Sequence, residues 1–383
     1  MVTAPQGFHV HAGQAGVAHD GRDDFAVLVS DVPAVVSGMF TRSRFAGPSV
    51  VLSRTACEDN RARGVVVLSR NANVANGTAG AQNATAVRDG VAKALGVPAD
   101  EMLIASTGVI GVPYPMDSVR DAVERLEYPT GTDFLAAANA IMTTDTRPKA
   151  ISVSCGDATI VGIAKGVGML EPNMATMLAF FCTDAAISAP VLDRVFRAVV
   201  ARTFNAVSVD TDTSTSDTAA IFANGLAGPV DLMRFEHALY DAALHLVKQI
   251  ASDGEGASKL IEVRVTGARD DAQAKRVGKS VVNSPLVKTA VHGGDPNWGR
   301  VAMAIGKCED DLDIQPSRVR IGFADFDVYP GEPNEATMAK LVEHLNGGEV
   351  LIRVDLGIAD GYFTVYGCDL TEGYVHLNSA YTT

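Results

Sequence analysis

The chain has 383 residues, of which 47% are hydrophobic and 20% charged, enough for one large domain or two ordinary ones around a sizeable core. A formal net charge of −13 argues against nucleic acid and anionic membranes as partners, because those select basic surfaces, and leaves small polar or zwitterionic substrates open. Five scattered cysteines without a CxxC pair, no secretory signal and no apolar run near roughly 18 residues predict a cytoplasmic protein.

Short apolar runs predict nine strands along the chain, at 26–30, 65–69, 102–106, 150–154, 177–182, 260–267, 318–323, 350–354 and 362–367. Apolar residues at helical spacing predict helices at 81–95, 117–126, 132–142, 189–203 and 232–251. Ser188 is the expected N-cap of the fourth helix, with Pro190 in its first turn. Because helices fall between groups of strands, the pattern favours layered sheets with helices outside over one parallel sheet.

Two segments resemble ligand-binding loops but lack a required residue. The sequence RVGKS (276–280) ends like a phosphate-binding loop, yet Gln273 stands where that pattern needs a glycine, so we expect a helix end there. The sequence DTDTSTSDT (210–218) begins like a calcium loop, but Thr215 replaces the glycine and Ile221 the bidentate glutamate. Neither segment predicts a site of its usual kind.

The histidines do not complete a known catalytic or metal signature. His9 and His11 form an HVH pair with no third ligand in register, which predicts surface histidines. His292 lies in a glycine-rich segment that could border a site, but no serine or cysteine partner is marked in the sequence. A GxSxG elbow is also absent from the sequence.

The segment KGVGMLEPNMATMLAFFCTDA (165–185) places Thr176 where a loop enters an apolar strand, with no adjoining side chain to activate its hydroxyl. Cutting the bond after Ala175 would supply a base. The freed α-amine of Thr176 would have a pKa of about 7.7–8.0, so a useful fraction of it is neutral at physiological pH. The same hydroxyl can make that cut by attacking the Ala175 carbonyl in an N-to-O acyl shift. The alternative is a threonine that only begins a buried strand.

The stretch KGVGMLEPNMATML resembles the autocleavage motif of the ornithine acetyltransferase family of glutamate N-acetyltransferases, K-G-x-G-M-x-x-P-x-x-A-T-M-L. Further blocks resemble the same family in the same order, over nearly the whole chain: 38–50, 106–111, 141–149, 204–218, 250–263, 283–300 and 374–383. Two segments, GRDDF and TRSRFAGPSV, also occur in members encoded in clavulanic-acid biosynthetic clusters.

The resemblance implies an αββα sandwich similar to that of N-terminal nucleophile hydrolases. It implies cleavage between Ala175 and Thr176 into chains 1–175 and 176–383, which fold together and assemble as two copies of each (α2β2). Family members move an acetyl group from N-acetylornithine to glutamate, and some also use acetyl-CoA. The implied cycle is ping-pong through acetyl-Thr176, and we expect no cofactor and no metal.

The resemblance also assigns site residues. Thr176 is then nucleophile and base, while the Thr107 hydroxyl and the Gly108 backbone N–H form the oxyanion hole. The implied substrate-binding residues are Thr143, Lys165, Thr176, Glu255, Asn378 and Thr383. By charge complementarity, Lys165 would bind a substrate carboxylate and Glu255 an amino group, although either could instead form a surface pair. Asn378 and Thr383 imply that the C-terminus folds back over the site.

One position departs from the family pattern, and two other functions remain open. Arg70, in LSRNANVANG (68–77), replaces a glycine of the family; it either alters donor preference or packs outside the site. The first alternative function is a self-cleaving amidohydrolase or aminopeptidase, in which water resolves the acyl-threonine. The second is a non-catalytic small-molecule binding protein that never cleaves itself.

Overall fold

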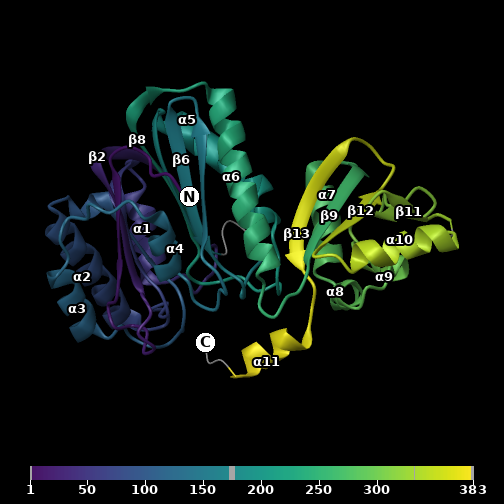
Figure 1. The fold of residues 1–383 in the computed structure, drawn as a ribbon, viewed down its shortest axis with the longest axis horizontal. Coiled ribbons are helices and arrows are strands. Elements are labelled where there is room, and N and C mark those ends of the chain that lie inside the picture. Colours follow the sequence, from purple (N-terminus) through teal and green to yellow (C-terminus); the bar gives the residue numbers. More distant parts are fainter. Residues whose placement is uncertain (1, 172–176, 332, 381–383) are drawn as a thin grey trace.

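The structure is a computed structural model that describes residues 2–171, 177–331 and 333–380. The described residues form two α/β units that lie side by side, one with an eight-stranded sheet and one with a five-stranded sheet (Figure 1). The first unit ends with α6 (Leu232–Ser252), and the second begins with β9 (Leu260–Ala268).

The first sheet runs in the order β4-β3-β2-β8-β7-β6-β5, with β1 pairing with β2. Its strands are β1 (Phe8–Gly13), β2 (Phe25–Phe40), β3 (Arg61–Leu68), β4 (Met102–Ser106), β5 (Lys149–Cys155), β6 (Ala158–Lys165), β7 (Leu178–Ala186) and β8 (Thr218–Pro229). The 16-residue β2 pairs with β3 from Phe25 to Val35, with a register shift between Val29 and Ala34, and its last residues from Val35 to Phe40 pair with β8. One strand therefore belongs to both halves of the sheet.

The two halves of this sheet pack face to face. Val67 of β3, Phe180 of β7 and Phe222 of β8 are buried in one shared core between them. The neighbouring side chains point the opposite way: Leu68 packs under α2 and α3, and Phe181 under α5 and α6. The layers therefore run helix, sheet, sheet, helix (Figure 1), and the expected αββα sandwich is confirmed.

Helices cover the outer faces of the first sheet, except that α4 contributes Phe134 and Ala137 to the core between the sheet halves. The helices are α1 (Pro48–Ala56), α2 (Gly77–Leu95), α3 (Met116–Glu124), α4 (Phe134–Ala140), α5 (Ala189–Arg202) and α6, with short 3₁₀ turns η1 (Ala99–Glu101) and η2 (Phe204–Ala206). The α6 sequence explains its placement. It begins at Asp231, whose side chain accepts a hydrogen bond from the Arg234 N–H, and Phe235, Leu239 and Leu246 form one buried face.

The second unit has the sheet order β11-β10-β12-β9-β13, in which only the β9–β12 pair is parallel among the described strands. The remaining elements are α7 (Asp271–Val282), α8 (Pro285–His292), α9 (Trp298–Gly306), β10 (Arg320–Phe323), β11 (Phe326–Tyr329), α10 (Glu335–Leu345), β12 (Glu349–Asp355), β13 (Gly361–Cys368) and α11 (Glu372–Ala380). Helix α7 packs on β9 and β13 through Val277 and Val281. RVGKS (276–280) thus lies near the end of a helix, as predicted.

The predicted division into chains 1–175 and 176–383 falls at residues outside those described. On either side of it, β6 and β7 are hydrogen-bonded neighbours, paired from Ile160–Thr183 to Lys165–Leu178. Two chains divided there would share one sheet. Within the described ranges, none of the helices is long and apolar enough to cross a membrane.

Candidate active site

A cavity of about 210 Å³ lies where β4, β6, the segment after α4 and α11 meet. Its lining residues are Thr107, Gly108, Ile110, Thr143, Thr144, Lys165, Gly168, Met169, Asp210, Asp212, Ser214, Thr215, Ser216, Glu255, Tyr374 and Asn378. A larger cavity of about 790 Å³, lined partly by Arg42, Arg44, Arg54 and Arg197, contains none of the predicted site residues in its described lining.

The smaller cavity gathers six predicted site residues, Thr107, Gly108, Thr143, Lys165, Glu255 and Asn378, from five separate segments of the chain. Ala175, Thr176 and Thr383 lie outside the described residues. Met177 follows Thr176 directly: its carbonyl accepts the Thr218 N–H at 2.9 Å. A Cβ on Gly166 would lie 3.1 Å from the Met177 Cβ, so the start of β7 is adjacent to the residue that follows Lys165.

The predicted oxyanion-hole residues follow the last residue of β4. Thr107 is buried, and Gly108 has a φ of +129°, which favours glycine. A Cβ on Gly108 would lie 2.1 Å from the carbonyl carbon of Arg70 and 2.5 Å from the Asn71 nitrogen. From the sequence, glycine is expected here because a Cβ would obstruct substrate; the structure adds that the neighbouring backbone leaves no room for one.

Lys165 ends β6, and its buried Nζ lies 3.3 Å from the Thr143 Oγ1. Burial lowers the pKa of Lys165, because the charged ammonium loses solvation, while the carboxylates of Asp145, Asp217 and Glu255 oppose that shift. Burial also raises the pKa of Asp217 well above its usual range. The cavity therefore presents a lysine that gives up its proton more readily than an exposed one.

Glu255 is held by three segments. Its Oε1 accepts a hydrogen bond from the Thr144 Oγ1 at 2.7 Å, and its Oε2 accepts one from the Asn378 Nδ2 at 2.8 Å. Its backbone N–H donates to the Val167 carbonyl at 2.8 Å. A Cβ on Gly168 would come within 2.4 Å of the Glu255 Cδ, so the chain after β6 passes directly over this carboxylate.

Helix α11 brings the C-terminal segment back to the first unit, as predicted for Asn378. Tyr374 and Asn378 line the cavity, and a Cβ on Gly256 would lie 2.3 Å from the Tyr374 nitrogen. Burial, together with the carboxylates of Asp210 and Glu255, raises the pKa of Tyr374 to about 12. Its phenol therefore keeps its proton at neutral pH and can donate a hydrogen bond.

The acidic segment rejected as a calcium loop lines the cavity in another role that sequence reasoning missed. Asp210 accepts hydrogen bonds from the backbone N–H groups of Met169 and Leu170 at 2.6 and 2.7 Å. The Asp212 carbonyl accepts the Glu171 N–H at 2.7 Å. This segment thus holds the described part of the loop that precedes Ala175. The segment 204–218 resembles the family pattern, but its sequence alone does not indicate these hydrogen bonds.

Arg70, the departure from the family pattern, borders the site. Its Nη1 donates to the Thr143 carbonyl, and its backbone takes a φ of +73° beside Gly108. Arg70 is not among the described residues that line the cavity and reaches the site through the Thr143 carbonyl, so its effect on donor preference stays a prediction. The positive φ is a conformation that glycine adopts more easily.

The three histidines singled out in the sequence do not line this cavity. His9 Nε2 lies 3.0 Å from Asp31, and His292 Nδ1 lies 2.9 Å from Asp369. The His11 ring packs edge-on against Phe25. In the part of the chain that the structure describes, no group of three or more His, Cys, Asp or Glu side chains is arranged to hold a metal ion.

The chain is similar to known proteins over nearly its whole length. The model of the ArgJ family matches residues 9–383. The chain is 68% identical to glutamate N-acetyltransferase Oat2 of Streptomyces clavuligerus, covering 99% of this chain and 98% of that protein. It is 55% identical to the arginine biosynthesis bifunctional protein ArgJ of Rhodococcoides fascians, covering 99% and 95%. The crystal structure of the arginine biosynthesis bifunctional protein argJ from Bacillus halodurans matches with a TM-score of 0.49 and 39% identity, covering 52% of this chain and 96% of that one.

Proposed function

The chain belongs to the ArgJ family, and on that premise we propose that it transfers an acetyl group from N-acetylornithine to glutamate. The observation that carries the proposal is one cavity of about 210 Å³ that is lined by six residues of the family pattern. Lys165 supplies a cation to that cavity and Glu255 an anion, which suits a substrate that carries both a carboxylate and an ammonium group.

In the proposed cycle, the Thr176 Oγ attacks the acetyl carbonyl while its own α-amine takes the hydroxyl proton. The Thr107 hydroxyl and the Gly108 N–H donate to the oxyanion of the tetrahedral intermediate; one such donor contributes about 10²–10³ in kcat. The α-ammonium then returns the proton to the leaving amine, and ornithine departs. The neutral amine of glutamate attacks the acetyl-threonine ester and gives a proton to the α-amine of Thr176, which passes it to the departing Oγ; this regenerates the threonine and yields N-acetylglutamate.

Self-cleavage is tested by the intact mass of the purified protein beside its Thr176→Ala variant. Scaling 40.0 kDa by chain length gives fragments of about 18 and 22 kDa, the larger with Thr176 at its N-terminus. The Thr176→Ala variant is expected to stay at 40.0 kDa. A wild type that remains one active chain would show that the α-amine is not the base.

Acetyl transfer is tested by incubating cleaved protein with N-acetylornithine, with and without glutamate. We expect glutamate to accelerate release of ornithine and N-acetylglutamate to appear in equal amount. Release that ignores glutamate would indicate the amidohydrolase or aminopeptidase alternative. An uncleaved protein that binds ornithine without turnover would indicate the binding protein. Replacing the donor with acetyl-CoA tests whether the enzyme is bifunctional, as the name of the Rhodococcoides fascians relative states for that protein.

We also propose a cytoplasmic α2β2 assembly. Light scattering is expected to give about 80 kDa, twice the 40.0 kDa chain. A mass near 40 kDa would exclude that assembly. The pathway served, arginine or clavulanic acid synthesis, is distinguished by whether deletion of the gene creates an arginine requirement or removes the secondary product.

A further inference from the structure

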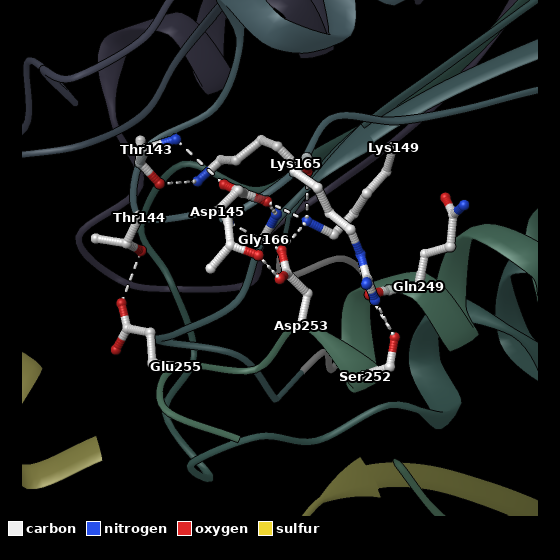
Figure 2. A network of polar contacts seen from close by, with 12 residues as sticks. Thr143, Thr144, Asp145, Lys149, Lys165, Gly166, Gln249, Ser252, Asp253 and Glu255 are labelled. Atoms are coloured by element: carbon white, nitrogen blue, oxygen red, sulfur yellow. Dashed lines mark hydrogen bonds and ion pairs between the residues drawn. The ribbon is translucent and has the colours of Figure 1, made fainter. Parts of the chain in front are cut away.

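A buried ionic network connects to the residues of the cavity (Figure 2), and Asp145, Lys149 and Asp253 at its centre are not among the described lining residues. The Lys149 Nζ lies 2.7 Å from the Asp145 Oδ1 and 2.7 Å from the Asp253 Oδ2. The side chains of Lys149 and Asp145 are 0% exposed, and that of Asp253 is 4% exposed. Because desolvation offsets most of the attraction in a buried ion pair, these three residues, the buried triad, are weak candidates for a purely stabilising role.

Asp145 joins two segments that line the cavity. Its Oδ2 accepts the Thr143 N–H at 3.1 Å, and its Oδ1 accepts the Gly166 N–H at 2.9 Å. Thr143 follows α4, whereas Gly166 directly follows Lys165 at the end of β6. One carboxylate therefore sets the position of Lys165 relative to Thr143.

Asp253 makes the matching connection on the side of Glu255. It accepts the Thr146 N–H at 3.1 Å and also the Thr146 hydroxyl, and it lies two residues before Glu255. Figure 2 shows Glu255 and Lys165 approaching the Thr143–Asp145 segment from different directions, with Lys149 between Asp145 and Asp253. Lys149 thus links the support of the cation to the support of the anion.

We propose that the buried triad positions Lys165 and Glu255 relative to each other and thereby sets how well the cavity binds a substrate that carries both charges. The inference rests on the proposed function. Each triad residue acts through another residue, so these are positioning residues. The family pattern names Lys165 and Glu255 as site residues, and the buried triad gives a physical reason for the distance between them.

The charges of the network support this role. Burial alone would raise the pKa of Asp145, but Lys149, Lys165 and the Gly166 N–H together lower it below its usual value, so the carboxylate is ionised. The charged groups facing Lys165 are Asp145, Asp217 and Glu255, which raise its pKa, and Lys149, which lowers it. Removing Asp145 should therefore make Lys165 lose its proton at lower pH, whereas removing Lys149 should have the opposite effect.

The test compares Asp145→Asn with Asp184→Asn as a matched control. Asp184 is also buried and accepts two backbone N–H groups, from Gln6 at 2.8 Å and Thr159 at 2.7 Å. Thr159 lies six residues from Lys165 along β6, about 20 Å away. Both variants are expected to lose thermal stability. Only Asp145→Asn should raise the KM for N-acetylornithine, by at least about tenfold, and move the basic limb of kcat/KM to lower pH.

If Asp145→Asn does not fold, the double variant Lys149→Met with Asp253→Asn tests the same link, because it removes one charge of each sign. We expect a raised KM and a basic limb at higher pH. Unchanged KM and pH profile in whichever variant folds would overturn the inference. Acetyl transfer by the wild type in the same assay tests the proposed function separately. Calorimetry of ornithine binding tests the inference even where turnover is absent, because the variants are expected to bind ornithine about tenfold more weakly than the wild type.

Discussion

At the residue scale, the site depends on backbone positions as much as on side chains. Gly108 combines a φ of +129° with a neighbouring carbonyl carbon 2.1 Å from where its Cβ would be. Lys165 and Glu255 lie in one cavity but are held by separate hydrogen-bonded segments. A substitution at Gly108 must therefore displace the neighbouring backbone, whereas substitutions at Lys165 and Glu255 change the charges that the cavity presents.

Replacing Gly108 with alanine should lower kcat by about 10²–10³, because the loop must move and its N–H leaves the oxyanion. Gly111→Ala is the control. Gly111 has a φ of +82°, and no atom lies within 4 Å of the place its Cβ would take, so only backbone strain is added, of order 1–3 kcal/mol. Steady-state kinetics and melting temperatures measured on both variants separate the two effects. Equal kcat losses in the two variants would count against an oxyanion role for Gly108.

The pH dependence of kcat/KM should have two limbs. Activity should rise as the Thr176 α-amine loses its proton at about pH 7.7–8.0, because only the neutral amine acts as a base. It should fall as Lys165 loses its proton, and since burial lowers that pKa from 10.5, the fall should begin below the ordinary lysine range. In Lys165→Arg the guanidinium keeps its charge, so the basic limb should disappear. A basic limb that persists there would exclude Lys165 as its origin.

At the element scale, β7 shows why the first unit has two cores. Its run from Leu178 to Ala185 is buried on both faces, which is the pattern of a strand inside a layered fold. Phe180 enters the core between the sheet halves, whereas Phe181 packs edge-on against Phe196 and Phe204 under the outer helices. The strand that follows Thr176 is therefore anchored from both sides.

Phe181→Ala should destabilise the protein by about 3–5 kcal/mol, because it leaves a cavity among well-packed aromatic rings. Phe45→Ala is the matched control: Phe45 is 70% exposed, so its truncation should change stability by less than about 0.5 kcal/mol. Urea unfolding at one fixed protein concentration measures both. A small effect at Phe181 would mean that the surrounding helices can collapse into the space.

Helix α11 is an element with a site role and little share in the core. No residue of α11 is buried, yet its Asn378 hydrogen-bonds Glu255 and its Tyr374 lines the cavity. Asn378→Ala should therefore raise the KM several-fold while the melting temperature changes little, because the side chain is exposed and its hydrogen bond orients Glu255 at the cavity. Ser379→Ala, on the same helix, is the control. A lowered melting temperature with unchanged KM would assign Asn378 a structural role.

Many element positions could be predicted from the sequence. All nine predicted strands and all five predicted helices coincide with observed elements, because strongly apolar runs and helical periodicity are properties of consecutive residues. The strands β1, β6, β8 and β11 were missed, as were α1 and most helices of the second unit. Alternating histidines in β1 and glycines in β6 and β8 weaken the apolar pattern by which strands are predicted. The structure shows why β6 has glycine at position 162: a Cβ there would lie 2.5 Å from the Phe181 ring.

At the scale of the whole molecule, the second unit supports the site in the first. The Lys279 Nζ of α7 donates to the Val207 carbonyl at 2.6 Å, and the Lys288 Nζ of α8 donates to the Val209 carbonyl at 2.9 Å. These carbonyls closely precede Asp210, whose carboxylate holds the chain before the predicted cleavage point. The C-terminal helix then returns from the second unit to Glu255.

The sequence by itself determined the mixed α/β class, most of the strands and, through ordered motif blocks, the family and the residues proposed for the site. Those properties depend on residues close together in the chain. Only the tertiary structure decided that β2 serves two sheet layers, that Asp253 reaches Lys149 across 104 residues, and that Asn378 reaches Glu255 across 123. The physical reason is that such contacts are selected by the packing of whole layers, which no local pattern encodes.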